Sequence, residues 1–331
     1  MTARDQRNKT PLIDDTGRVW QVDVLVADGF VLMELAGLVD TLRVANRINP
    51  APLFRWTYRS AKGGQIESRC RAFVHSEPFV ARPSADYVFV IGNSDPDNPA
   101  LSLGPVIESY TYRDAQVFLL AEAASRYISE NSGKSQGHAT HWENQAFLRE
   151  RAGQFDASYT IASQDGPVVT CAGMGATVDV VLALIGRHMS SAAKMVVADV
   201  LLHERIRDYG SMQPFSGIKS TTTGDRELDD CIEIMQANVE EPIPINELVA
   251  VLGISNRSLE RKFQTFLATT PNTYYRELRL NKANNLLFNT TMTVAEIGLA
   301  CGFASGFSTL YKKFYGITPM ALRKKRRGGK G

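Results

Sequence analysis

The sequence predicts an α/β N-terminal domain, with a mostly parallel sheet flanked by helices, and an all-α C-terminal domain with two helix-turn-helix units. Three observations predict this. Apolar runs of strand length alternate with helical patterns before residue 208. Two helix-turn-helix patterns follow near the C-terminus. Charge is also unevenly distributed along the chain. Residues 245–331 are strongly basic, with 14 Lys/Arg and four Asp/Glu, whereas the whole chain of 331 residues has a net charge of only +2.

Strands and helices alternate in the first part of the chain. We expect a strand at residues 19–27 and then a helix at residues 30–48, in which leucines recur at helical spacing. The other expected strands are residues 54–60, 87–91 and 117–120, and the other expected helices are residues 174–185 and 191–207. Residues 87–91 are apolar throughout, as is typical of parallel strands buried on both faces. This order predicts a largely parallel sheet covered by helices.

The first helix-turn-helix pattern lies at the start of the basic segment. Gly253 supplies the turn, and Ser255 is the expected N-cap of the second helix. We expect Leu259, Phe263 and Phe266 to face inward on that helix. The outward side chains are then Asn256, Arg257, Glu260, Arg261 and Gln264. A short outward face rich in Arg, Asn and Gln is typical of a helix that reads bases in the major groove of DNA.

A connecting helix is expected at residues 273–288, and the second pattern occupies residues 294–319. Its candidate DNA contacts are Ser308, Thr309 and Lys312. Two such units on one linking helix can reach two successive faces of the major groove of one duplex. Since the segment is strongly basic, double-stranded DNA is the expected partner, and a solvated basic face is the alternative.

At these residues the chain resembles the AraC/XylS family of bacterial transcription regulators. The matching stretches are residues 255–263, 275–283, 297–303 and 316–319, in the order and spacing of the family. The resemblance implies that Arg257, Glu260 and Arg261 lie at base-reading positions. There are two departures from the family pattern. Ala268 replaces a glycine, and the second unit is about two residues shorter where its recognition helix begins, so this half either reads bases or only grips phosphates.

The N-terminal part resembles the class I glutamine-amidotransferase-like, or PfpI-protease-like, domain that one subgroup of this family carries. The matching stretches are residues 30–46, 140–144, 169–173 with Asp179, and 203–207. The resemblance implies a one-component regulator that responds to a ligand. The expected organisation is a disordered tail at 1–17, a ligand-sensing domain at 18–208, a linker at 209–224, a DNA-binding domain at 225–322 and a basic tail at 323–331.

Composition narrows the cellular setting and the chemistry. The sequence has no apolar run long enough to span a membrane, and its four cysteines are scattered without metal or redox spacing. We therefore expect a cytoplasmic protein with no metal and no cofactor. In catalytic members of the amidotransferase fold, a nucleophile sits on a strained turn, or elbow, between a strand and a helix. Here the elbow is expected at Ala121 or Glu122, without a cysteine, so we expect no catalytic residue and no enzyme activity.

The candidate effector pocket lies at the carboxyl ends of the strands, where open α/β sheets bind ligands. Its candidate residues are Asp28, Glu34, Asn93, Glu122, His141 and Trp142. Carboxylates beside an indole ring suit a small cationic or amino-acid-derived metabolite. Each residue also has a structural alternative: Glu34 as a solvated helix residue, His141 as a hydrogen-bonded structural histidine, and Trp142 as part of the core.

Three classes of function remain open. The first, which we favour, is a ligand-responsive transcription regulator, expected to be an activator that works as a homodimer with RNA polymerase. The second is an enzyme of the amidotransferase fold tethered to DNA, which the elbow without a nucleophile disfavours. The third is a DNA-binding protein whose α/β domain only dimerises. Binding of a small molecule by the N-terminal domain distinguishes the first class from the third.

Overall fold

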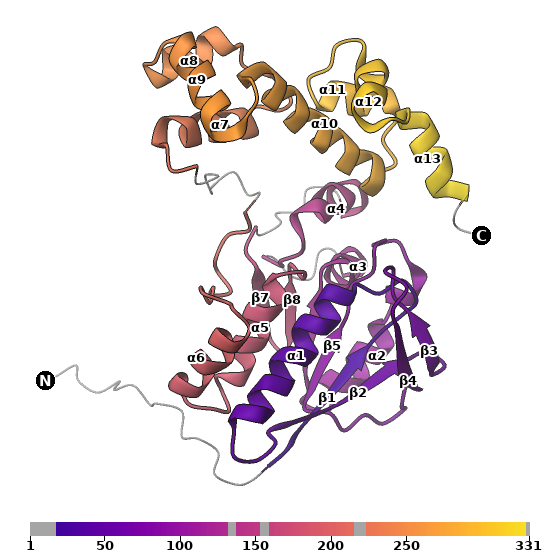
Figure 1. Ribbon diagram of the computed structural model, residues 1–331. Helices are drawn as coiled ribbons and strands as arrows, with labels where there is room; N and C mark the ends of the chain where they lie inside the picture. The colour runs from indigo at the N-terminus through magenta and orange to yellow at the C-terminus, as the bar shows by residue number, and fades with distance from the viewer. Residues whose placement is uncertain (1–17, 132–136, 153–158, 215–222, 329–331) are drawn as a thin grey trace, which may run out of the picture. The chain divides into compact units, whose positions relative to one another are not determined.

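The computed structural model describes residues 18–131, 137–152, 159–214 and 223–328 (Figure 1). The chain divides into two compact units, Met1–Ser211 and Met212–Gly331. Among the described residues, every strand belongs to the first unit, and the second unit is helical. The tail expected at residues 1–17 lies outside the described residues, as do parts of the expected linker and basic tail.

A sheet of eight strands forms the centre of the first unit. The strands are β1 (Trp20–Leu25), β2 (Phe54–Ser60), β3 (Gly64–Glu67), β4 (Phe73–Pro78), β5 (Tyr87–Val90), β6 (Gln116–Leu120), β7 (Ala162–Asp165) and β8 (Val168–Cys171). Their order across the sheet is β3-β4-β2-β1-β5-β6-β8-β7, and among these strands only the edge pairs β3–β4 and β7–β8 are antiparallel. The prediction of a mostly parallel sheet is confirmed.

Helices cover both faces of this sheet, as Figure 1 shows. One face packs against α1 (Leu32–Ile48), α5 (Ala176–Ile185) and α6 (Ser191–Val200), and the other against α2 (Gly104–Thr111) and α3 (Glu122–Glu130). Side chains alternate along β5, so that Phe89 joins the first core whereas Val88 and Val90 join the second. Burial on both faces explains why this strand is apolar at every position.

The helix predicted over residues 191–207 is wrong in its second half. Helix α6 ends at Val200, and Leu202 has a left-handed backbone with φ +53°. Asp179 of α5 holds the following segment: its Oδ1 lies 2.8 Å from His203 Nε2, and Arg207 donates to both carboxylate oxygens. Because Asp179 is fully buried, it requires these partners, and this requirement overrides the helical periodicity of the segment.

The second unit contains two helix-turn-helix units, as predicted. Its helices within residues 223–328 are α7 (Arg226–Ala237), α8 (Ile245–Leu252), α9 (Asn256–Leu267), α10 (Pro271–Asn289), α11 (Val294–Ala300), α12 (Phe307–Tyr315) and α13 (Pro319–Gly328). Helices α8 and α9 form the first helix-turn-helix, and α11 and α12 form the second helix-turn-helix. Gly253 ends α8 with φ +68°, and the Ser255 hydroxyl accepts a hydrogen bond from Ser258 N at the start of α9.

The prediction that Phe266 faces inward is wrong. Its side chain is 47% exposed, whereas Leu259 and Phe263 of the same helix are fully buried. Helices α7, α8 and α10 supply the core around α9, and this core takes up only the side of the helix that bears the other two residues. The apolar stripe of α9 is therefore narrower than its sequence indicated.

Arg279 fastens the linking helix α10 to the second helix-turn-helix unit. Its Nε donates to the Cys301 carbonyl at 2.9 Å, and its Nη2 donates to the Gly302 carbonyl at 2.6 Å. The guanidinium also lies 4.2 Å from the centre of the Phe303 ring. A Cβ at Gly302, where φ is +70°, would lie 2.5 Å from Pro242 Cγ. The turn of the second helix-turn-helix is thus held closely against the rest of the helical unit.

Replacing Ala268 with Gly is expected to stabilise the helical C-terminal unit against unfolding. Ala268 ends α9 in the left-handed conformation, with φ +51° and ψ +32°, and its Cβ makes that conformation unfavourable. Glycine removes this cost but gains freedom in the unfolded chain, so the net increase in unfolding free energy is about 0.5–1 kcal/mol. Urea denaturation of both proteins measures the difference. A loss of stability would show that the Ala268 methyl group makes packing contacts that outweigh the backbone cost.

Candidate functional site

The outer face of α9 carries all five residues that were predicted to contact DNA from the first helix-turn-helix. The side chains of Asn256, Arg257, Glu260, Arg261 and Gln264 are all exposed. The basic residue Lys262 points elsewhere, because its ammonium group pairs with Asp225 and Glu227 at the start of α7. The pKa of the Asp225 carboxyl is lowered by the hydrogen bond from Lys262. This pairing holds α9 against α7 and leaves Arg257 and Arg261 available for a partner.

The second recognition helix, α12, differs at its start. Its N-cap is Gly306, with φ +71° and no capping side chain. Ser308, Thr309 and Lys312 are exposed, whereas Phe307 and Tyr311 are buried. The Tyr311 hydroxyl donates to Asn284 Oδ1 of α10 at 2.5 Å, which sets the rotation of α12 about its axis. The three predicted contacts therefore share the solvent-facing side of this helix.

In the N-terminal α/β unit, the elbow between β6 and α3 is at Ala121. This residue has φ +41° and ψ −106°, a conformation that is costly for any residue with a Cβ. Its methyl group is fully buried, and no side chain at this position can act as a nucleophile. The strained turn of a catalytic elbow is therefore present, but the reactive group is absent.

Glu34 of α1 lies beside this elbow and is fully buried, so it is not a solvated helix residue. One carboxylate oxygen accepts the backbone N–H of Gly92 at 2.8 Å, and the other accepts that of Met174 at 3.0 Å. Burial raises the pKa of Glu34 to about 7, and the two backbone donors oppose this rise. A Cβ at Gly173 would lie only 2.1 Å from Glu34 Oε1, so the carboxyl group occupies space that a side chain there would need.

Glu122, the first residue of α3, is partly buried and places a second carboxyl group next to the first. A Cβ at Gly92 would lie 2.7 Å from Glu122 Oε2 and 2.9 Å from Glu34 Oε2, so both oxygens border the same small space. Asn144 Nδ2 donates to Glu122 Oε1 at 3.2 Å, whereas Glu122 Oε2 is buried and has no hydrogen-bond partner among the residues that the structure describes. Burial, and then repulsion from Glu34, raise the pKa of Glu122 to about 8.

The remaining predicted pocket residues lie on neighbouring loops. Asn93 is buried, and its amide donates to the Asp28 carbonyl at 2.6 Å, whereas the Asp28 carboxylate is exposed and accepts the backbone N–H of Glu67. His141 and Trp142 are partly buried, with their ring centres 5.6 Å apart. Burial lowers the pKa of His141. The structure thus brings Glu34 and Glu122 together, and it commits Asp28 and Asn93 to loop contacts.

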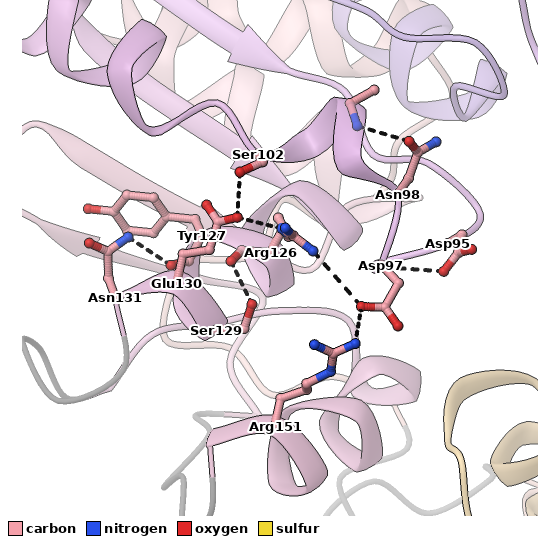
Figure 2. A network of polar contacts seen from close by, with 11 residues as sticks. Asp95, Asp97, Asn98, Ser102, Arg126, Tyr127, Ser129, Glu130, Asn131 and Arg151 are labelled. Atoms are coloured by element: carbon pink, nitrogen blue, oxygen red, sulfur yellow. Dashed lines mark hydrogen bonds and ion pairs between the residues drawn. The ribbon is translucent and has the colours of Figure 1, made fainter.

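Ion pairs fasten the short helix α4 (Gln145–Ala152) to α3, as Figure 2 shows. Asp97, in the loop after β5, accepts a hydrogen bond from Arg151 of α4 at 2.7 Å, and Arg126 of α3 lies 3.9 Å from the same oxygen. Arg126 also donates to Glu130 at 2.6 Å. Because Asn144 directly precedes α4, these contacts help to keep its amide against the carboxyl group at the elbow.

The sequence indicated Asn144 only as part of a longer motif, and it did not indicate Gly92 or Gly173 as site residues. A glycine directly after a buried strand was the only available signal for Gly92. Its importance depends on two carboxyl groups from distant parts of the chain, which no local pattern reveals. Gly173, just after β8, was missed for the same reason, because its importance depends on the Glu34 carboxyl group from a distant part of the chain.

The thiols do not supply the missing nucleophile. Cys171 is fully buried at the end of β8, and its burial, with the nearby Glu34 carboxyl, raises the pKa of the thiol far above its usual value. Cys70 is exposed in the turn between β3 and β4. Within the described ranges, no cluster of three or more His, Cys, Asp or Glu side chains is arranged to hold a metal ion. In the same ranges, no helix has the length and apolar character needed to cross a membrane.

Comparison with known proteins gives consistent matches along the chain. A family model described as "Helix-turn-helix domain" matches residues 248–325. The "HTH-type transcriptional regulator GbdR" of Pseudomonas aeruginosa is 30% identical over 313 residues, which cover 90% of this chain and 82% of the relative. The "HTH-type transcriptional regulator ArgR" of the same species is 30% identical over 295 residues, with 88% of each chain covered. A solved "AraC family transcriptional regulator from Pseudomonas putida" covers 55% of this chain and 99% of its own, with 19% identity and a TM-score of 0.49.

Proposed function

Because the chain belongs to the AraC/XylS family of transcriptional regulators, in the subgroup with an N-terminal class I glutamine-amidotransferase-like domain, we propose that it activates transcription in response to a small cationic or amino-acid-derived metabolite. Its role as a DNA-binding transcription regulator follows from the family. The observation that carries the proposal is the buried, unpartnered oxygen of Glu122 beside an elbow without a nucleophile. A buried acceptor without a partner is a place where a ligand donor or cation gains the most.

Specific duplex binding by the full chain is the first requirement of this function. Selection of bound duplexes from a random pool is expected to yield a defined sequence. Its affinity exceeds that for random DNA by about 10³ or more, and it falls steeply with added salt. Equal affinity for all sequences at every salt concentration would contradict the proposal.

Replacing Arg261 with Ala is expected to cost about 1–3 kcal/mol of specific binding and to relax the preference at one base position. The side chain is exposed on α9 and has no partner among the described residues, so its guanidinium can form two hydrogen bonds to a guanine. Binding of the selected duplex and of single-base variants measures the effect. If all sequences weaken equally, Arg261 contacts phosphate rather than a base.

We propose that the α/β unit senses its ligand without chemistry. Ala121 supplies no nucleophile, and the buried thiol of Cys171 stays protonated. Glu34 is committed to two backbone N–H groups, so Glu122 is the carboxyl group that meets the ligand. Since a charged carboxylate is costly at this depth without a partner, a bound cation stabilises the charged form of Glu122 and makes a charge-assisted contact with it.

Binding of a cation at Glu122 is expected to release a proton. With a pKa of about 8, Glu122 is mostly protonated at neutral pH, and a bound cation favours its charged form. Quaternary ammonium compounds and amino acids are the compounds to screen. Calorimetric titration of a bound compound, in buffers that differ in ionisation enthalpy, then measures proton release, and affinity is expected to rise as the pH approaches 8.

The same two groups predict how the stability of the unliganded unit changes with pH. Both folded-state pKa values lie above the ordinary carboxyl value of 4.5, so the stability that is fully present below that pH is lost as the pH rises to about 7 for Glu34 and about 8 for Glu122. Glu122→Gln is expected to reduce this loss and to abolish both proton release and the transcriptional response.

Trp142→Ala is expected to abolish the response, and Cys171→Ser is the matched control that retains it. A full response in both pocket variants would place the ligand elsewhere, and binding of no compound would leave the unit only a dimerisation role.

We further propose that the protein acts as a cytoplasmic homodimer that recruits RNA polymerase. The exposed apolar side chains Met195, Val196 and Val200 on α6 support self-association, because large exposed apolar groups on one side of a helix are typical of contact surfaces. A ligand alters transcription only if it binds two states of the assembly unequally. Sedimentation equilibrium of the full chain tests the dimer, and a monomer at all concentrations would contradict it.

A further inference from the structure

A cavity lies at the opposite end of the sheet from the elbow. Its volume is about 510 Å³, within the range of small-molecule sites, and it opens at the amino ends of β1, β5 and β6. The side chains that matter here are Arg18, Trp20, Asp86, Arg113 and Arg187, all of which line it. The elbow, in contrast, follows the carboxyl end of β6, so the two sites do not share residues.

Among the described residues, two of the three guanidinium groups in this cavity have no carboxylate partner. Arg18 is neutralised by Asp86, whose second oxygen accepts the Gln21 backbone N–H at 2.8 Å. Arg187 donates to the neutral amide oxygen of Gln116 at 2.6 Å. The Arg113 guanidinium makes no hydrogen bond and no ion pair with any described residue, and the backbone N–H of Arg113 donates to the Tyr110 carbonyl. The carboxylate of Asp114 also lines the cavity, so the excess is one positive charge.

One wall of the cavity is aromatic and well fixed. The Trp20 ring lies 4.2 Å from the His188 ring, measured between centres, and the Arg18 guanidinium lies 4.0 Å from the centre of Trp20. His188 Nε2 is 2.7 Å from the Tyr87 hydroxyl, and this contact is buried. These contacts hold an apolar surface beside the two unneutralised guanidinium groups, which suits a ligand that combines an anionic group with a flat or apolar body.

We infer that this cavity binds a small anionic molecule that carries a carboxylate or phosphate group, held by Arg113 and Arg187 against Trp20. Arginine is the side chain best shaped for such groups, because its planar fork matches their oxygens. The inference is independent of the cation site proposed at the elbow. If both sites are used, the regulator combines two ligands of opposite charge at opposite ends of one sheet.

Trp20 provides a local reporter for the test. In a full-length Trp56→Phe, Trp142→Phe background, Trp20 is the only tryptophan left, and its fluorescence is followed during titration with succinate and with inorganic phosphate. Chloride at equal ionic strength is the reference. A saturable change with one anion identifies carboxylate or phosphate as the recognised group. Calorimetric titration of the chain without the two Phe substitutions repeats the comparison independently of that background.

The double variant Arg113→Gln, Arg187→Gln is expected to weaken the apparent affinity at least tenfold. The double variant Arg69→Gln, Arg205→Gln is the matched control, since both residues are exposed, do not line the cavity and together lose the same two charges. Unchanged affinity in the control together with the loss in the double variant supports the site. Equal responses in all proteins, a response that does not saturate, or no response to either anion beyond that of chloride would overturn it.

Discussion

Replacing Phe263 with Ala is expected to destabilise the DNA-binding unit by about 3–5 kcal/mol, a large share of the stability of a small domain. Phe263 is fully buried at the centre of the first helix-turn-helix, where residues of α7, α8 and α10 surround it. Its ring meets the edge of Tyr274 with ring centres 5.4 Å apart. Truncation therefore removes buried apolar surface and leaves a cavity among side chains that cannot all move inward.

Phe266→Ala is the matched control, because it removes the same atoms from the same helix at a position that is 47% exposed. Urea denaturation of the full-length proteins, followed by helical circular dichroism, compares the two variants. The control is expected to change the unfolding free energy by less than about 1 kcal/mol and to leave specific DNA binding in place. Similar losses in both variants would mean that Phe266 is buried by a contact beyond those described within the unit.

Replacing Asp179 with Ala is expected to destabilise the N-terminal α/β unit by about 3–5 kcal/mol. The Asp179 carboxylate is fully buried and accepts hydrogen bonds from the Arg207 guanidinium and backbone, and its Oδ1 lies 2.8 Å from His203 Nε2. Removing it leaves a guanidinium partly buried without its counter-charge. The segment after α6 then loses the group that holds it against α5.

Asp199→Ala is the control for this variant, since Asp199 is exposed on α6 and its side chain has no partner among the described residues. Thermal denaturation of the full chain is expected to show a large decrease for Asp179→Ala and almost none for the control. Asp179→Asn keeps an acceptor without the charge, and its loss separates the contribution of hydrogen bonding from that of ion pairing. A small effect of Asp179→Ala would show that water replaces the carboxylate.

Local patterns predicted the parts of this protein that local forces decide. Strands β2 and β5 were predicted within one residue because their apolar runs are bounded by turns, and Gly253 and Ser255 mark a turn and a cap by their own chemistry. The elbow at Ala121 was predicted from the strand that precedes it. Residues 201–207 were predicted wrongly, because a buried carboxylate on another helix decides their path.

The candidate site shows the same division. The sequence placed Glu34 and Glu122 near the elbow, yet it could not show that both are at least partly buried, since their contacts come from Gly92, Met174 and Asn144 on separate segments. Long-range contacts of this kind depend on the completed sheet. The pKa values of both carboxyl groups follow from that burial and were therefore beyond reach of the sequence pattern.

The contacts of Arg279 determine what kind of operator this protein can use. Since α10 links the two helix-turn-helix units and Arg279 secures the turn of the second one to it, the interval between α9 and α12 is fixed within the domain. One base pair inserted between the two operator elements would turn one of them by ~35° around the duplex, given about 10.5 base pairs per turn. Because this interval is fixed, the domain cannot follow such a rotation, and an operator contacted by both helices is expected to keep its internal spacing constant.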